Sequence, residues 1–201
     1  MKVIVFDTET TGIPSAQLDL ENQPHICQFA AVLWECDPVN KKMDELLRFD
    51  ELIRPPIALE YDSVAIHGIT NKMLEDKPAF AEVADRIIEL FHRADVAVAH
   101  NIGFDKTIIQ YELQRLNRSG DFLPEQIFDT MLASRDLCQL PGRHGNFKAP
   151  RLGELYQFLF AEQFANAHNA LADVLATSKC LEELLRREIF VPEESAQDSL
   201  F

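Results

Sequence analysis

The chain begins with an unbroken apolar run that two acidic residues follow. Residues 3–6 read VIVF, and Asp7 and Glu9 come next with one residue between them. A short continuous apolar run is typical of a strand buried on both faces, as in the interior of a mixed or parallel sheet. Because side chains two apart on a strand point to the same side, the two carboxylates should converge. Converging carboxylates at the end of a buried strand are costly unless a cation or a proton lies between them.

The apolar pattern along the rest of the chain predicts strands first and strand–helix alternation later. Residues 25–36 and 45–55 are expected to form two strands joined by a hairpin turn at 37–42. After a loop with a short helix at 67–77, we expect helices at 79–93, 101–118, about 128–137, 151–160 and 169–187, with short strands at 95–99 and 126–128. This order indicates an α/β domain with a central mixed sheet over residues 1–187 and a flexible tail over 188–201.

Composition narrows the class of protein. A chain of 201 residues suits one domain, and 47% hydrophobic with 26% charged residues is ordinary for a soluble globular protein. The opening MKVIVFD lacks the features of a signal peptide, and no window approaches the length of a membrane span. The four cysteines have no C-x-x-C pairing, so reduced thiols in a cytoplasmic protein are expected.

The net charge of −14 argues against a protein that simply coats nucleic acid. It argues less against an enzyme that meets phosphate through divalent cations, because bound cations reverse the local field. The acids are also unevenly placed: residues 137–153 contain none, while Arg143, His144, Lys148 and Arg151 fall there. This stretch is either a phosphate-tracking strip or a flexible solvated loop.

Two further acids stand in positions where acids are unusual. Asp105 lies on the apolar stripe of the helix expected from Asn101, which requires either a partner or a functional role. Asp173 lies one turn inside the last helix, with Ala170, Ala176 and Thr177 on its own face. Such small neighbours let a helix approach the sheet closely, which would bring Asp173 toward the first strand.

Four converging carboxylates would repel one another without cations, and hard ions such as Mg²⁺ or Mn²⁺ suit an all-oxygen site. Zinc is less suitable because no Cys/His cluster accompanies the acids. Two such ions can stabilise the attacking and leaving oxygens of a phosphodiester displacement. His168 would be the nearby group with a pKa suited to deprotonating water, and it can share a face with Asp173 only if it lies off the helix.

The motifs DTETTG (7–12), HNIGFD (100–105) and HNALAD (168–173), in this order, resemble those of the DEDDh 3′→5′ exonucleases. That family includes the proofreading epsilon subunit of bacterial DNA polymerase III. The resemblance covers about residues 2–187, and HGIT (67–70) and FDTMLASR (128–135) are similar to intervening segments of the family. It implies a ribonuclease H-like fold and metal-dependent release of nucleoside 5′-monophosphates from DNA 3′ ends, in proofreading or repair.

Carried over to this chain, the resemblance implies a role for each residue. Asp7, Glu9 and Asp173 would hold the metal that activates water, Asp7 and Asp105 would serve the second, and His168 would be the general base. The 3′-terminal nucleotide would be bound by Thr8, Thr10, Ile13, His67, Asn101 and Phe104.

Two other functions remain open. The first is an RNA-directed exonuclease similar to oligoribonuclease, since the five catalytic residues do not tell ribose from deoxyribose. The second is a catalytically silent adaptor between clamp and polymerase, against which the intact set of five argues. An aspartate-nucleophile phosphatase, whose first strand ends in D-x-D-x-T, fits poorly because Glu9 stands at the second acid and the His168/Asp173 motif would be unexplained.

The C-terminal QDSLF resembles the short peptides by which bacterial replication proteins dock onto the sliding clamp. Leu200 and Phe201 would fill an apolar pocket while Gln197 orients the chain. The alternative is a frayed end with incidental apolar residues. The partners expected from the sequence are therefore DNA 3′ ends, a replicative polymerase and the clamp, and no membrane.

Overall fold

The computed structural model describes residues 1–118, 120–165 and 167–192. Its centre is a five-stranded mixed sheet in the order β3-β2-β1-β4-β5. The strands are β1 (Lys2–Thr10), β2 (Ile26–Asp37), β3 (Lys42–Leu52), β4 (Val96–Ala99) and β5 (Gln126–Asp129). β1, β2 and β3 pair antiparallel, whereas β4 runs parallel to both β1 and β5. The expected α/β class with a mixed sheet is confirmed.

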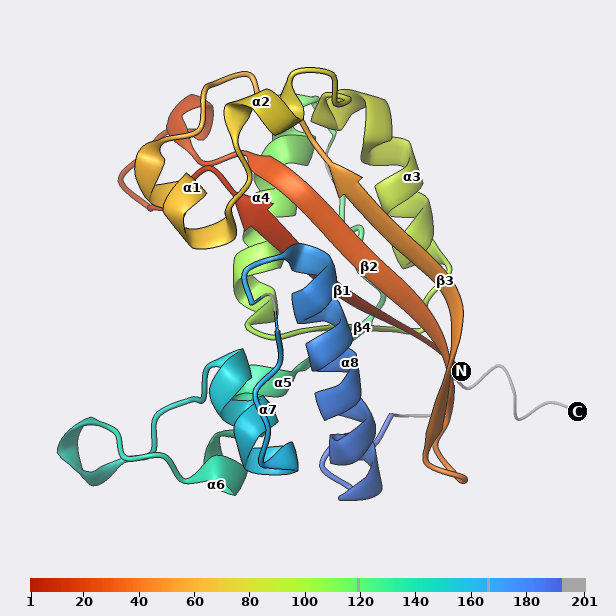
Figure 1. Cartoon of the computed structure of the whole chain (residues 1–201). Coiled ribbons are helices and arrows are strands. Elements are labelled where there is room, and N and C mark those ends of the chain that lie inside the picture. Colours follow the sequence, from red (N-terminus) through yellow and green to blue (C-terminus); the bar gives the residue numbers. More distant parts are fainter. Residues whose placement is uncertain (119, 166, 193–201) are drawn as a thin grey trace, which may run out of the picture.

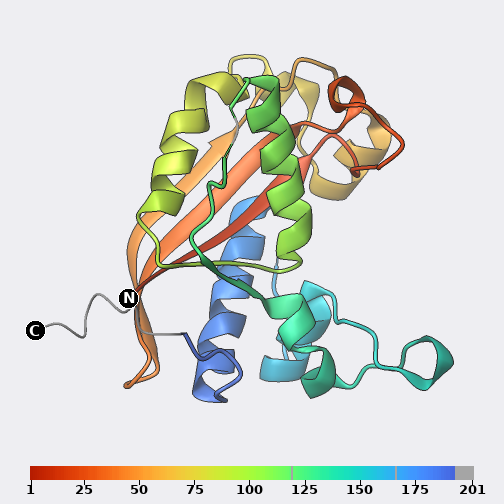
Figure 2. The ribbon, with the colours of Figure 1, turned by 180° about the vertical axis from the view of Figure 1, so that it is seen from behind.

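Helices cover both faces of this sheet (Figures 1 and 2). α3 (Phe80–His92) and α4 (Ile102–Arg115) pack on one face, and α8 (Ala170–Arg186) packs on the other. Successive residues of β1 therefore enter different cores. Ile4 and Phe6 belong to the α3/α4 cluster, while Val3 and Val5 belong to the α8 cluster. This alternation explains why the opening run of the chain is apolar without interruption.

The remaining helices are short: α1 (Tyr61–His67), α2 (Asn71–Leu74), α5 (Thr130–Ala133), α6 (Arg135–Cys138) and α7 (Leu152–Phe160). The sequence did not predict α1, which follows the Pro-rich end of the third strand. The single helix expected up to about residue 137 was wrong, because two four-residue helices meet at Ser134. The Ser134 hydroxyl donates to the Thr130 carbonyl at 2.6 Å, a side-chain bond that competes with regular helix continuation.

β1 is longer than expected, and this places the first two acids inside the strand. Antiparallel pairing with β2 carries β1 through Thr10, with a register shift after Glu9, whereas parallel pairing with β4 stops at Val5 and Val98. β1 therefore continues alone on the side where β4 has ended. Ligands of open α/β sheets bind beyond the carboxyl ends of parallel strands in this way.

The packed part of the chain continues past residue 187, where the tail was expected to begin. Phe190 is buried and its ring centroid lies 4.8 Å from that of Phe128. Gln197, Leu200 and Phe201 lie outside the described residues, so the clamp-binding peptide stays a prediction. Within the described ranges, no helix is both long and apolar enough to span a bilayer.

Candidate active site

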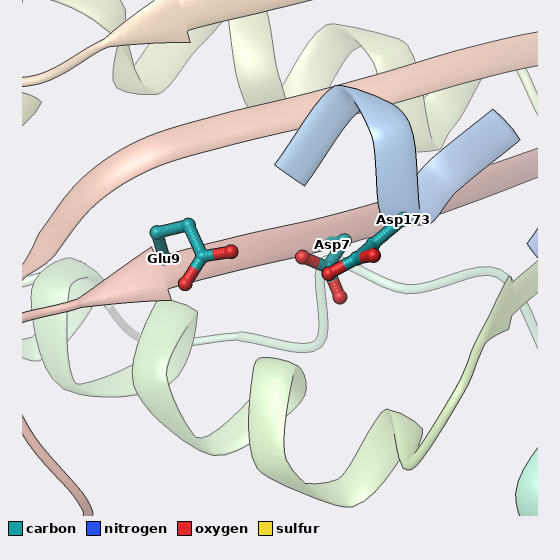
Figure 3. Close-up of side chains that lie close together, drawn as sticks. All are labelled: Asp7, Glu9 and Asp173. Atoms are coloured by element: carbon teal, nitrogen blue, oxygen red, sulfur yellow. The ribbon is translucent and has the colours of Figure 1, made fainter. Parts of the chain in front are cut away.

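Three carboxylates meet on the α8 face of the sheet (Figure 3). Asp7 and Glu9 project from β1, and Asp173 comes down from the first turn of α8. One carboxylate oxygen from each of the three lies within 4.8 Å of the others. The convergence expected from their spacing along the strand is thus observed.

Gln28 of β2 fixes the end of α8 that carries Asp173. The Gln28 side chain is almost fully buried, and its Oε1 accepts from the Ala170 N–H at 3.2 Å and from the Asn169 amide at 3.4 Å. Its Nε2 donates to Asp50 of β3 at 2.8 Å. Sequence reasoning missed this residue, although a polar side chain within the apolar run 26–33 must have a buried partner.

Asp105 approaches β1 from the α4 side. It is 2% exposed, and its Oδ1 accepts from the Thr8 N–H at 3.0 Å and from the Thr8 hydroxyl at 2.7 Å. The Thr8 N–H thus finds a carboxylate where β4 no longer supplies a carbonyl. Asp105 does not join the group of three oxygens, but its charge raises the pKa of both Asp7 and Glu9. Asp105 therefore has a structural partner, Thr8, and also lies beside the other acids of the site.

Replacing Thr8 by valine is expected to lower the free energy of unfolding by about 1–3 kcal/mol, because a buried carboxylate loses a donor. The Thr8 hydroxyl also lowers the pKa of Asp105, so that pKa should rise in the variant. Urea unfolding measures the first effect. Thr107→Val is the matched control, since among the described residues its hydroxyl bonds only to the Gly103 carbonyl, on the surface of α4. Equal losses in the two variants would contradict this interpretation of Thr8.

Burial raises the pKa of all four acids, and repulsion from the other acids of the site raises the pKa of Asp7 and Glu9 further. Burial is the larger cause for Glu9, followed by Asp173 and Asp105, and the pKa of Glu9 rises to about 8. Burial also raises the pKa of Asp105 to about 7 and that of Asp173 to about 6. The pKa of Asp7 is raised well above its usual range, by burial first and then by the charges of the other three acids. Protons or cations must therefore neutralise this site at physiological pH.

His168 lies just outside α8, as the spacing to Asp173 requires. It has a positive φ of 67°, and Asn169 caps the helix by accepting from the Ala172 N–H. The His168 backbone N–H donates to Asp173 Oδ2 at 3.1 Å, while its imidazole side chain is exposed. The backbone bond lowers the pKa of Asp173 against the effect of burial. His168 and Asp173 together line a cavity of about 480 Å³ beside the start of α7.

A second cavity of about 500 Å³ adjoins Glu9 on the other side of the site. Five of the six expected nucleotide contacts line it: Thr8, Thr10, Ile13, His67 and Phe104. Asn101 does not; it precedes α4 with φ 78°, and its backbone N–H donates to Asp129 at 3.1 Å. Glu60, Asp62 and Ile66 also line the cavity, and they belong to the α1 region that the sequence did not predict as a helix.

The loop that carries Ile13 is held from outside the cavity. Arg115 of α4 donates to the carbonyls of Leu20, Gln23 and Pro24, with its shortest bond of 2.6 Å to Gln23. Arg115 also forms an ion pair with Glu112 of the same helix, in which its Nη1 lies 3.2 Å from Glu112 Oε2. These bonds anchor the loop while the Ile13 side chain remains 80% exposed at the cavity rim.

The donor set fits a hard divalent cation. The ligands are carboxylate oxygens, which Mg²⁺ and Mn²⁺ prefer. Asp173 Oδ1 is buried and has no hydrogen-bond partner among the described residues, and such an orphan acceptor is expensive unless something else contacts it. A cation among Asp7, Glu9 and Asp173 would satisfy this oxygen and relieve the repulsion that raises the pKa of Asp7 and Glu9.

Comparisons with known proteins agree with this geometry. Residues 4–181 match the family described as Exonuclease. The chain is 30% identical to DNA polymerase III subunit epsilon of Buchnera aphidicola, over 100% of this chain and 76% of that protein. It is 36% identical to the same subunit of Pasteurella multocida, over 75% of this chain and 57% of that protein, so it spans little more than half of the latter relative's length.

A solved structure shares the fold at low identity. The nuclease domain of 3′hExo, a DEDDh family member, bound to rAMP, is similar with a TM-score of 0.72 at 14% identity, over 96% of this chain and 97% of that one. This likeness confirms the ribonuclease H-like arrangement implied by the sequence motifs. With a family match over most of its length and its acids gathered on the first strand and the last helix, the chain belongs to the Exonuclease family and is similar to the epsilon subunits of DNA polymerase III.

Proposed function

We propose that this protein is a metal-dependent 3′→5′ exonuclease that releases nucleoside 5′-monophosphates from DNA 3′ ends, in replication proofreading or repair. The observation that carries the proposal is the meeting of the Asp7, Glu9 and Asp173 oxygens within 4.8 Å, with Asp105 buried beside them. The relatives named DNA polymerase III subunit epsilon favour DNA as the substrate and a replicative polymerase as the partner.

Asp7, Glu9 and Asp173 would hold one Mg²⁺ or Mn²⁺, and Asp105 with Asp7 would serve a second. When bound, such a pair of ions lowers the pKa of water and stabilises charge on the attacking and leaving oxygens. Gln28 and Thr8 keep the ligands in place, because the first fixes the start of α8 and the second fixes Asp105.

His168 would act as the general base. Its backbone bond to Asp173 and its place outside α8 leave the imidazole exposed at the edge of the carboxylate group. There it can take a proton from water as the water oxygen attacks the phosphorus of the terminal phosphodiester. The bond from phosphorus to the 3′ oxygen of the shortened strand then breaks, and that oxygen leaves with a proton as a 3′-hydroxyl.

The cavity beside Glu9 would take the 3′-terminal nucleoside. Its lining combines apolar contacts from Ile13, Ile66 and Phe104 with the polar edge of β1. Ile13 is exposed at the rim, where it can lie against the last bases. Asn101, which the family resemblance implied for this pocket, stands outside the lining and would act through the start of α4 instead.

An RNA-directed exonuclease is the second candidate function, because the structurally similar 3′hExo domain has rAMP bound. Sugar preference depends on contacts to the 2′-hydroxyl, and the acids Glu60 and Asp62 in the cavity offer acceptors for such a group. The silent-adaptor alternative fits less well, since a protein without catalysis has no need of four acids with raised pKa values.

A digest of matched DNA and RNA strands, labelled at either the 3′ or the 5′ end, tests the function. With Mg²⁺ or Mn²⁺ we expect immediate release of a labelled mononucleotide from 3′-labelled DNA and a ladder from 5′-labelled DNA, both lost with EDTA. Faster turnover of RNA would support the second candidate. Activity that is indifferent to EDTA, or no nucleotide release at all, would overturn the proposal.

Binding to the sliding clamp is a separate proposal, which is based on the QDSLF sequence at the C-terminus. Deleting residues 197–201 should abolish binding to the sliding clamp and leave hydrolysis of a short oligonucleotide unchanged. Unchanged clamp affinity in the truncated protein would exclude this role for Gln197, Leu200 and Phe201.

A further inference from the structure

The stretch between α6 and α7 forms an arm that extends from the body of the protein (Figures 1 and 2). We call residues 139–151 the basic arm. Within it, the Gly142 N–H donates to the Asn146 carbonyl at 2.9 Å and the Lys148 N–H donates to the Leu140 carbonyl at 3.0 Å. A Cβ atom on Gly142 would lie 2.6 Å from the Asn146 oxygen, so the tight closure requires glycine. The arm is thus a shaped hairpin rather than the plain solvated loop that the sequence left open.

The base of the arm, at Pro150 and Arg151, contacts residues and a cavity that belong to the candidate active site. His100 Nε2 lies 3.0 Å from the Pro150 carbonyl, and His100 lies two residues before α4, which carries Asp105. At the other side of the base, Arg151 lines the same 480 Å³ cavity as His168 and Asp173. A strand leaving the carboxylates through this cavity would therefore meet the arm next.

The charges on the arm differ from those of the surrounding surface. Most lysine and arginine side chains of the protein pair with a carboxylate, and Lys148 pairs with Glu154 at 2.5 Å. Arg143 and Arg151, in contrast, are exposed, and their guanidinium groups form no ion pair within 4.0 Å in the described part of the chain. The backbone N–H of Arg151 donates to Glu154 Oε2 at 2.8 Å, and the charge of Arg151 lowers the pKa of Glu154 without a direct contact between the charged groups. In a protein of net charge −14, two exposed arginines without an ion pair, both within a stretch that contains no acid, are a local attraction for an anion.

The arm also offers an aromatic surface. Phe147 is 45% exposed although it pairs with Pro141 through an isolated β-bridge. Cationic side chains that follow a phosphate backbone, together with an exposed aromatic ring on which a base can stack, are the usual elements of single-strand binding sites. A duplex offers no unpaired base to such a ring, so a single strand is the better occupant.

We propose that the basic arm binds the phosphate backbone of a single-stranded nucleic acid upstream of its 3′ end, with Arg143 and Arg151 as phosphate contacts and Phe147 as a stacking surface. The inference rests on the proposed function for the position of that 3′ end. The inference goes beyond the proposed function because it assigns substrate binding to a surface outside the carboxylate site and its nucleoside cavity.

The test is the affinity for a 5′-fluorescent 20-nucleotide single strand, measured by anisotropy with Ca²⁺ in place of Mg²⁺ over a series of salt concentrations. Arg143→Ala should weaken binding about fivefold at 0.1 M salt and reduce the salt slope by about 0.7, because one phosphate contact to a single strand releases about that number of counterions. The double variant Arg143→Ala/Arg151→Ala should lose about 25-fold on the same basis. Phe147→Ala should weaken binding without changing the salt slope.

Arg93→Ala is the matched control, since Arg93 is exposed at the end of α3 and has no carboxylate within 4.0 Å in the described chain. Equal effects of Arg143→Ala and Arg93→Ala, or a salt slope that the arm variants leave unchanged, would overturn the proposal. Hydrolysis of a dinucleotide in Mg²⁺, a substrate too short to reach the tip of the arm, tests the proposed function separately. A wild-type protein that binds the strand through the arm and cuts neither substrate would refute the nuclease activity and retain the binding surface.

Discussion

Asp7→Asn is expected to reduce hydrolysis of DNA 3′ ends by at least about 10³-fold and, at the same time, to make the metal-free protein more heat-stable at pH 8. The loss follows because Asp7 belongs to the group of three oxygens and would serve both cations, whose charge stabilisation contributes several kcal/mol to such reactions. The gain follows because burial and three neighbouring acids raise the pKa of Asp7 well above its usual range, so its charged form destabilises the folded state.

The measurements are turnover in Mg²⁺ and the melting temperature in EDTA, which should rise by at least ~3 °C for a domain of this size. Asp76→Asn is the matched control, because the Asp76 side chain is 83% exposed and lies far along the chain from the site. Retained activity in Asp7→Asn would refute the metal-dependent mechanism. A lower melting temperature than wild type in EDTA would show that the Asp7 carboxylate is stabilised by contacts other than cations.

Removing divalent metal should also make the stability of the wild-type protein fall as the pH rises. The pKa of Glu9 is raised to about 8, that of Asp105 to about 7 and that of Asp173 to about 6, from ordinary values of 4.5 for Glu and 3.8 for Asp. Between about pH 4 and pH 8 the folded state therefore binds more protons than the unfolded state, and the free energy of unfolding decreases with pH. Below this window both states are protonated and the repulsion disappears.

A thermal melt series in EDTA between pH 5 and pH 8 checks this prediction, and we expect a drop of at least ~5 °C toward pH 8. Adding millimolar Mg²⁺ or Mn²⁺ at pH 8 should restore the loss, since a ligand that binds only the folded state stabilises it. A melt at pH 8 with a sodium salt at equal ionic strength and no divalent cation is the control for general charge screening. Stability that is flat with pH in EDTA would mean that the four acids do not interact as their burial implies.

The elements that the sequence predicted well are those whose own residues specify them. The run 3–6 became β1, and the spacing of Phe80, Val83, Ile87 and Phe91 became the buried face of α3. The two helices that the sequence predicted wrongly or did not predict also have local causes. The helix expected through residue 137 breaks at Ser134, where a hydroxyl bonds back to Thr130. α1 is only seven residues long and has no apolar face to signal it, because Tyr61 and Ile66 are exposed and Ser63 is its buried residue.

The candidate acids could be selected from the sequence because their chemistry conflicts with their surroundings. Asp7 and Glu9 follow a buried run, Asp105 interrupts an apolar stripe, and Asp173 stands among small residues. What each acid contacts could not be read in the same way. Asp105 binds Thr8 across 97 residues, and Gln28 holds the start of α8 across 142, and neither partner carries a local signal of the other.

Periodicity, apolar runs and charge are local properties of the chain, so the sequence predicted the fold class, selected the four acids and His168 as candidate site residues, and marked the acid-free stretch that contains the basic arm. The folded structure was needed to show that three carboxylate oxygens meet within 4.8 Å, that Asn101 lies outside the cavity beside Glu9, and that the arm begins beside His168. These facts depend on where β4 ends against β1 and on how α8 docks onto the sheet. Both are set by contacts between residues far apart in sequence, and such contacts form only when the whole core packs.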